Sequence, residues 1–251
     1  MAEFLLFRLA GPMAAWGDIA VGEIRGSWSR PSKSAVLGLI AGALGHPRTD
    51  ATALLALDRG LGFAVRLDGG ERRARPFRDY HTTQSAVSRR SQRLLTRREE
   101  LASDDLATVL SERTYLTNAV WTIALWASGP KTPALDDIKQ ALLHPRFTPY
   151  LGRKACPLAR PLGPHVLLTD NLRSAFASYD AASAEAENCL PPQLRGDGRS
   201  GSKSAPIWFE MGAGLLEEAQ EETSRRDGLR QRRDWTFRDR REGLLRDAEA
   251  G

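Results

Sequence analysis

The chain has 251 residues, 41% of them apolar, and a formal net charge of +5 at pH 7. This composition supplies enough apolar material for one large domain or two small ones, and it excludes a chain that is disordered throughout. The positive excess is made almost entirely of arginine, which suits phosphate contact, although a basic chain is weak support for nucleic-acid binding by itself. Cys156 and Cys189 form no CxxC pair and the four histidines are scattered, so we expect reduced thiols, no metal and no other cofactor.

The N-terminal segment and the longest apolar run bear on the expected location of the protein. MAEFLLFRLAGP carries Glu3 and Arg8 inside its apolar run, which is not typical of a signal peptide. The apolar run after Ala35 is far shorter than the roughly 20 residues that span a bilayer. We therefore expect a soluble cytoplasmic protein without a membrane partner.

Hydrophobic patterning predicts four regular elements before residue 71: a strand over Phe4–Leu9, a helix that starts after Ser32 and stops at Gly45, a helix over Ala51–Leu57 and a strand over Leu61–Leu67. Ser32 suits the N-cap of the first helix, and Gly45 suits its C-terminal stop. Within this helix, Gly38 and Gly42 predict close packing of the helix on a sheet.

Composition changes abruptly after residue 71. The segment RRARPFRDYHTTQSAVSRRSQRLLTRR, residues 72–98, holds nine arginines and a single acid, Asp79. Large apolar residues are sparse in it, so the segment cannot bury a core of its own. We predict a projecting arm, disordered or hairpin-like, that becomes ordered against a polyanion.

Four further elements are predicted after the arm: a strand over Thr114–Trp126, a helix over Leu135–Leu143, a short strand over Val166–Leu168 and a final strand over Pro206–Met211. Residues 144–164 form a Pro- and Gly-rich loop with a basic Gly-Arg-Lys centre. Residues 175–187 are small and polar, and the tail beyond Glu217 alternates acids and arginines. No helix or strand is predicted for either of these last two segments.

The stretch RPSKSAVLGLIAGALG, residues 30–45, suggests a phosphate site because hydroxyls and a lysine stand at the start of a helix. A P-loop requires GxxxxGK[ST] after a buried strand, but Ser32 precedes Lys33 and Gly26 lies one position too far upstream. The stretch is therefore not a nucleotide-hydrolysing loop. It is either an anion site at the helix N-terminus or a capped helix with a solvated lysine.

The sequence contains one candidate for RNA cleavage and a broader pattern for RNA binding. His81 beside Tyr80 is the histidine–aromatic pair inside the basic arm, and the alternative is that both residues contact RNA without chemistry. Basic residues also cluster at the helix start and in the loop around Lys154, and aromatic residues are interleaved with them. Phosphate neutralisation combined with base stacking is typical of single-stranded nucleic-acid recognition.

Four motifs in a fixed order carry a family resemblance: LLFRLAGPMAAWG, RPSKSAVLGLIAGALG, RTYLTNAVWTIAL and HPRFTPYLGRKACPLARPL. Together they resemble the CRISPR-associated Cas-five family, in the form found in type I-E Cascade complexes. The similarity runs from about Phe4 to Leu162, with weaker likeness near residues 232–240. YLGRKACPL after the two N-terminal blocks is the most specific part, since each block alone is a weak signal.

The resemblance implies an α+β fold with a ferredoxin-like, RRM-related palm of the RAMP type, an inserted basic thumb and a short C-terminal extension. We expect the palm in residues 1–71 and 114–216, the thumb in 72–113 and a basic segment in 217–251. The implied function is a non-catalytic subunit that binds and caps the 5′ handle of crRNA. Its implied partners are the backbone subunit CasC, the large subunit CasA and, indirectly, target DNA.

Two alternatives remain open at this stage. Type I-C relatives cleave precursor crRNA with a Tyr–Lys–His set, which does not map here because Lys33 has no histidine near it and His81 has no lysine near it in the sequence. A general RNA- or DNA-binding protein unconnected to CRISPR is the second alternative.

The implied RNA-binding residues fall into three groups. The helix start supplies Arg30, Lys33 and Ser34. The arm supplies Arg78, His81, Arg89, Arg90, Arg93, Arg97 and Arg98. The loop supplies Arg153 and Lys154. Tyr115 and Trp121 are expected in the sheet core, with Tyr115 the one of the two expected to face RNA, whereas Trp16 is expected in the core or at a subunit interface. No catalytic or metal-binding residue is assigned.

Overall fold

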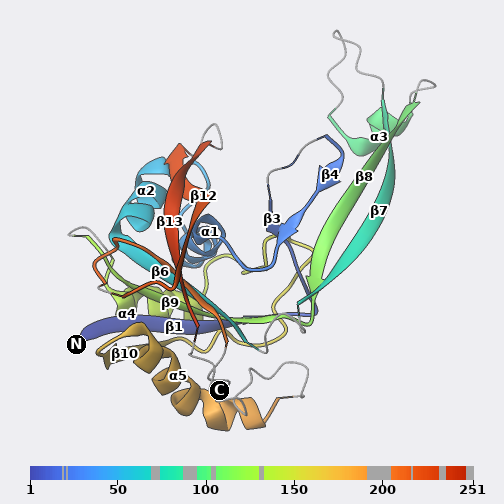
Figure 1. Cartoon of the computed structure of the whole chain (residues 1–251). Helices are drawn as coiled ribbons and strands as arrows, with labels where there is room; N and C mark the ends of the chain where they lie inside the picture. Colours follow the sequence, from blue (N-terminus) through green and yellow to red (C-terminus); the bar gives the residue numbers. More distant parts are fainter. Residues whose placement is uncertain are drawn as a thin grey trace.

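A seven-stranded antiparallel sheet forms the body of the protein (Figure 1). The computed structural model describes residues 1–18, 20, 22–68, 74–86, 95–102, 106–129, 133–190, 205–215, 217–231 and 236–246. The strands follow the order β10 (His165–Thr169), β1 (Ala2–Ala10), β9 (Val120–Ala127), β6 (Leu61–Asp68), β11 (Ile207–Glu210), β13 (Thr236–Leu245) and β12 (Glu221–Gln231). The predicted mixture of helices and strands is confirmed, and the structure adds that the strands form one large antiparallel sheet.

The central strands are apolar on both faces because helices cover the sheet on both sides. Leu5 and Phe7 of β1 point to one face, which is covered by α1 (Lys33–Leu44), α2 (Ala51–Gly60) and α4 (Leu135–Leu143). Phe4 and Leu6 point to the other face, which is covered by α5 (Leu172–Asn188). Strand pairing keeps this alternation in register, since Phe7 lies opposite Ile123 of β9.

The caps that the sequence predicts for α1 are confirmed. The Ser32 hydroxyl accepts a hydrogen bond from the Ala35 N–H at 3.1 Å. Gly45 ends the helix in the left-handed conformation, with φ of 85°, which glycine adopts without strain. The predicted strands over Phe4–Leu9 and Leu61–Leu67, and the predicted helix over Leu135–Leu143, are likewise present.

One prediction about regular structure is wrong, and two regions of regular structure were not predicted. The strand predicted over Thr114–Trp126 is two strands, because Asn118 takes a φ of 54° and turns the chain between β8 and β9. The small, polar stretch 175–187 is part of α5, a helix capped by Asn171. The charged tail supplies β12 and β13, which pair with each other and join the main sheet through β11.

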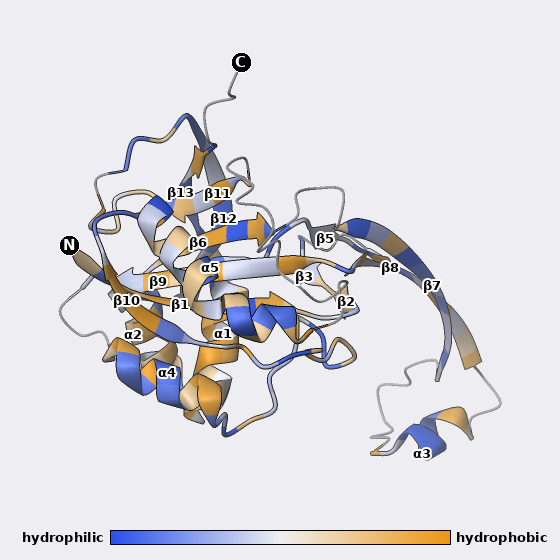
Figure 2. Cartoon of the chain, turned by 90° about the horizontal axis from the view of Figure 1, so that it is seen from below, coloured by the Kyte–Doolittle hydropathy of each residue, from blue (hydrophilic) through white to orange (hydrophobic). Residues whose placement is uncertain are grey.

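A long hairpin projects from the body and carries most of the predicted arm (Figure 1). β7 (Arg75–Ala86) pairs with β8 (Leu106–Thr117) along its whole length, and the short helix α3 (Arg97–Leu101) lies near the tip. Figure 2 shows this hairpin leaving the hydrophobic body of the sheet, with hydrophilic residues on α3. The short strands β2 (Met13–Ala14), β3 (Trp16–Gly17), β4 (Ile24–Arg25) and β5 (Ser27–Trp28) occupy the region between hairpin and body.

Arg8 is buried in the sheet and holds a cluster of acids beneath α5. Its guanidinium donates to Glu187 at 2.5 Å, to Asp180 at 2.6 Å and to the Thr122 hydroxyl at 3.0 Å. Asp68 lies 3.3 Å away. Burial alone would raise the pKa of Asp68, but the guanidinium groups of Arg66 and, to a lesser extent, Arg8 hold that pKa below its usual range. The buried Asp68 carboxylate therefore depends on the neighbouring arginines to remain charged.

The described helices do not meet the requirements of a membrane crossing. None of them combines the length and the hydrophobicity that crossing a bilayer takes.

Candidate functional site

The start of α1 is bound to the rest of the protein rather than open to a ligand. Lys33 is buried, and its Nζ donates to Glu210 at 2.7 Å and to the Asp58 carbonyl at 2.8 Å. The Lys33 backbone N–H donates to Asp227 at 2.9 Å. The Lys33 ammonium is therefore already neutralised inside the protein, and phosphate contact by Lys33 stays a prediction.

Arg30 is likewise engaged within the fold. Its guanidinium donates to Glu242 and lies 4.2 Å from the centroid of the Trp208 ring. The side chain is 13% exposed. An internal carboxylate and a cation–π contact therefore engage the Arg30 guanidinium, and its phosphate contact stays a prediction.

The acids that hold the helix start belong to the C-terminal hairpin and to β11. Asp227 of β12 accepts from Arg240 of β13 at 2.8 Å, and Arg240 also donates to Glu242 at 2.9 Å. Burial alone would raise the pKa of Asp227, but hydrogen bonding and charge from Arg240 hold it below its usual range. Burial raises the pKa of Glu210 of β11, although Lys33 opposes that rise. These charges fasten β11, β12 and β13 to α1.

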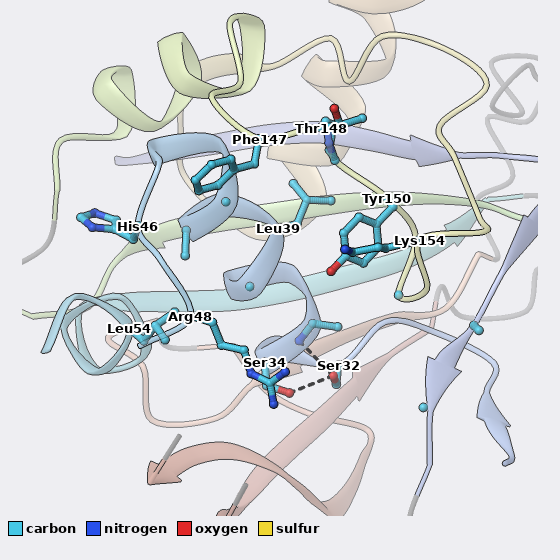
Figure 3. A pocket seen from close by; sticks show the side chains of 18 of the residues that line it. Ser32, Ser34, Leu39, His46, Arg48, Leu54, Phe147, Thr148, Tyr150 and Lys154 are labelled. Carbon is cyan, nitrogen blue, oxygen red and sulfur yellow. Dashed lines mark hydrogen bonds between the residues drawn. The ribbon is translucent and has the colours of Figure 1, made fainter. Parts of the chain in front are cut away.

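A pocket of about 930 Å³ lies over the exposed face of α1 (Figure 3). Ser34, Gly38 and Gly42 occupy successive turns of that face, and all three line the pocket. A Cβ added at Gly38 or Gly42 would meet no atom within 4 Å. The prediction that these glycines allow close packing on the sheet is wrong, since they face open space. Of the three residues predicted to contact RNA at the helix start, Ser34 is the one that lines this pocket, next to the N-cap residue Ser32.

Cationic and aromatic side chains line the pocket, among them Arg48, Lys154, Tyr150 and Phe147. Arg48 follows α1 in the chain and reaches toward Ser34, while Lys154 and Tyr150 come from the basic loop on the other side of the helix (Figure 3). Tyr150 is 41% exposed and Phe147 is 49% exposed. Neither Arg48 nor Phe147 was predicted: Arg48 stands in no basic cluster, and Phe147 lies within the motif HPRFTPYLGRKACPLARPL without having been assigned a role there.

The loop that carries Lys154 is fixed by its backbone. Gly152 has a φ of 82°, and a Cβ there would lie 1.9 Å from the Ala15 carbonyl oxygen. The Ala15 N–H donates to the Leu151 carbonyl at 3.0 Å, and the Leu151 N–H donates to the Cys156 carbonyl at 2.8 Å. Burial raises the pKa of the Cys156 thiol. Glycine is required here both for the left-handed backbone and for the close approach to Ala15.

Tyr115 is a buried residue. It is 7% exposed, and the guanidinium carbon of Arg153 lies 4.7 Å from the centroid of its ring. Tyr115 therefore lies in the core, as predicted, with its ring covered by the loop arginine, and its contact with RNA stays a prediction. Trp16 and Trp121 are both buried and meet edge to face with 5.2 Å between ring centroids, as expected for core residues.

The projecting hairpin presents several of the predicted arm residues to solvent. Arg78 is exposed on β7, 3.5 Å from Glu112, and Arg98 is exposed on α3. Arg97 pairs with Glu100 at 2.6 Å, and the His81 ring lies 2.8 Å from Asp79. Arg89, Arg90 and Arg93 lie outside the described residues. Among the residues that the structure describes, no group of three or more His, Cys, Asp or Glu side chains could hold a metal ion.

Comparison with known proteins gives the class to which this chain belongs. Residues 4–247 match the family model for CRISPR-associated protein (Cas_Cas5), so the chain is a member of the Cas5 family. It is 36% identical over 190 residues to the CRISPR system Cascade subunit CasD of Escherichia coli (strain K12). That match covers 74% of this chain and 80% of CasD.

Two solved structures share the fold. A chain of a CRISPR RNA-guided surveillance complex is similar with a TM-score of 0.61 and 24% identity, covering 97% of this chain and 90% of that one. A crystal structure of a Cas protein is similar with a TM-score of 0.55 and 24% identity, covering 97% and 95%. At this identity the similarity establishes the architecture alone.

Proposed function

We propose that the protein is a non-catalytic subunit of a type I-E Cascade complex, in which it binds and caps the 5′ handle of crRNA. The observation that carries this proposal is the pocket over α1, with cations and exposed aromatic rings at its edges, in a chain 36% identical to CasD. In the complex it contacts the backbone subunit CasC and the large subunit CasA, and it meets target DNA only indirectly.

The sheet topology supports a ferredoxin-like palm as the scaffold for this function. β1, β6, β9 and β10 occur in this order along the chain, with β2–β5 and the hairpin β7–β8 inserted between them, and they lie in the sheet in the order β10–β1–β9–β6. Helices α1 and α2 connect the first two of these strands and α4 connects the last two, on the same face of the sheet. This is the arrangement of a β-α-β-β-α-β unit. The hairpin β7–β8 then corresponds to the inserted thumb.

The exposed thumb cations support contact with the RNA backbone. Arg78 and Arg98 are exposed on an element that projects from the body, where a polyanion can approach them. Arginine forms planar, bidentate contacts with phosphate, so these residues position RNA without reading its sequence. Arg89, Arg90, Arg93, Arg97 and His81 keep the same predicted role on the arm, as do Arg153 and Lys154 on the loop.

The double variant Arg78→Ala/Arg98→Ala is expected to bind handle-containing RNA more weakly and with less dependence on salt. Removal of one phosphate contact to single-stranded RNA reduces the slope of log affinity against log salt by roughly 0.7, so the slope falls by about 1.4. Equilibrium titrations over a range of salt concentrations measure this slope. The control is Arg59→Ala/Arg241→Ala, which removes two exposed arginines outside the thumb. Equal slopes for wild type and the thumb variant would contradict the proposed contact.

The same preparations test the catalytic alternative. A repeat-containing transcript incubated with the protein without metal is expected to remain intact. A discrete product that disappears in His81→Ala would replace the binding proposal with an endoribonuclease. Lys33 is a poor second candidate, because its ammonium is buried against Glu210.

A further inference from the structure

We infer that the pocket over α1 holds an unstacked segment of single-stranded RNA, and that Gly38 and Gly42 keep the floor of the pocket free of side chains for it. This inference rests on the proposed function and adds the place on the protein where the RNA binds. The pocket volume of about 930 Å³ falls within the roughly 300–1,000 Å³ typical of ligand pockets.

The fold itself gives no reason for the two glycines. Glycine is less favourable than alanine in a helix interior, and Gly38 and Gly42 both lie inside the twelve-residue helix α1. Neither has the positive φ that would require glycine, and neither would press a Cβ against a neighbour. What glycine provides at these two positions is space above the helix.

The charges around that space favour an anion. Lys154 and Arg48 come from different segments and stand on different sides of the helix (Figure 3). Among the described residues that line the pocket, Asp18 is the one carboxylate. Ser34 adds a hydroxyl on the first turn of α1. Phosphates of an RNA strand fit this distribution, since lysine, arginine and serine are common partners of phosphate oxygens.

The aromatic side chains favour nucleobases over an extended peptide. Tyr150 and Phe147 expose much of their rings at the pocket, and stacking of unpaired bases on such rings is the usual basis of single-strand binding. An extended peptide normally adds to a sheet edge through main-chain hydrogen bonds. The floor here is the middle of a helix, whose N–H and C=O groups already bond within α1.

Filling the floor tests the inference in the full-length protein. Gly38→Leu places a branched side chain in the pocket, whereas Gly38→Ala adds one methyl group where nothing lies within 4 Å. Gly38→Ala is expected to raise the melting temperature by about 1–4 °C. Gly38→Leu is expected to stay folded and to weaken binding of repeat-derived handle RNA about 5- to 100-fold, the effect of losing one stacked base. Ala184→Leu, on the exposed face of α5 across the sheet, is the bulk-matched control.

The possible outcomes distinguish a failure of the pocket inference from a failure of the proposed function. A folded Gly38→Leu variant that binds handle RNA like wild type overturns the pocket inference and leaves the function standing. The inference is also overturned if that variant binds RNA normally but no longer joins the Cascade subunits. In that case the pocket binds a neighbouring protein subunit. If the wild type binds handle RNA and unrelated RNA equally well, and Gly38→Leu weakens both, then the pocket inference stands and the proposed recognition of the handle is overturned. If the wild type binds no RNA, both fail.

Discussion

Replacing Arg8 by methionine is expected to lower the free energy of unfolding by about 3–5 kcal/mol, because it removes one of the few cations that pair with a cluster of buried and half-buried carboxylates. Arg8 is 1% exposed and lies within 3.3 Å of Asp68, Asp180 and Glu187. Other arginines still contact these acids, so the variant is expected to fold. Denaturant unfolding at neutral pH measures the loss. Arg59→Met, at an exposed position of α2, is the control and is expected to change stability by less than about 0.5 kcal/mol.

The pH dependence gives a second check on Arg8. In the wild type the pKa of Asp68 is held low, so its contribution to stability is present above its unfolded pKa and is lost as the pH falls through its folded pKa. Without Arg8, protonation of Asp68 removes a buried negative charge that has lost one of its neighbouring cations. The difference between variant and wild type is therefore expected to shrink below pH about 4. A difference that is equally large at neutral and acid pH would mean that the variant loses packing rather than charge pairing.

Replacing Gly152 by alanine is expected to cost about 2–4 kcal/mol of unfolding free energy and to weaken RNA binding. Two effects combine, since alanine is strained at a φ of 82° and its Cβ would lie 1.9 Å from the Ala15 carbonyl oxygen. Relief of this clash moves the loop away from Ala15. Because the loop carries Tyr150 and Lys154, the pocket loses one wall. Thermal unfolding and RNA titration measure the two consequences.

A second glycine with a positive φ separates the cost of backbone strain from the cost of the steric clash at residue 152. Gly212 has a φ of 74°, but a Cβ there would meet nothing within 4 Å. Gly212→Ala is therefore expected to cost only the backbone strain of about 1–2 kcal/mol and to leave RNA binding unchanged. If Gly152→Ala and Gly212→Ala had equal effects, the close approach of the loop to Ala15 would have no energetic role.

Elements with a clear apolar period could be predicted from the sequence, and elements held by charge pairing could not. The strand from Phe4 and the helix capped by Ser32 have local signals that need no partner. The C-terminal hairpin has none, because its alternating acids and arginines look solvated. Asp227 and Arg240 are buried against each other, and only the fold reveals the pairing. Its role in the main sheet was therefore missed.

The same distinction explains the candidate site. Lys33 reads as a free cation in the sequence because Glu210, which neutralises it, lies in a strand far along the chain. Gly38 and Gly42 read as packing residues, since sequence alone does not tell which face of a helix is covered. Lys154 could be predicted, because its Gly-Arg-Lys loop is local and exposed. Sites assembled from distant segments depend on topology, which no single motif encodes.

The central proposal is that this Cas5-family chain holds the 5′ handle of crRNA within a Cascade complex. Co-expression of the tagged, full-length chain with the other Cascade subunits and a repeat array, followed by purification and photo-cross-linking, tests it most directly. We predict that the chain co-purifies with the subunits and intact crRNA and cross-links within the handle. Cross-links confined to the spacer, or a complex that assembles with crRNA in the absence of this chain, would contradict the proposal.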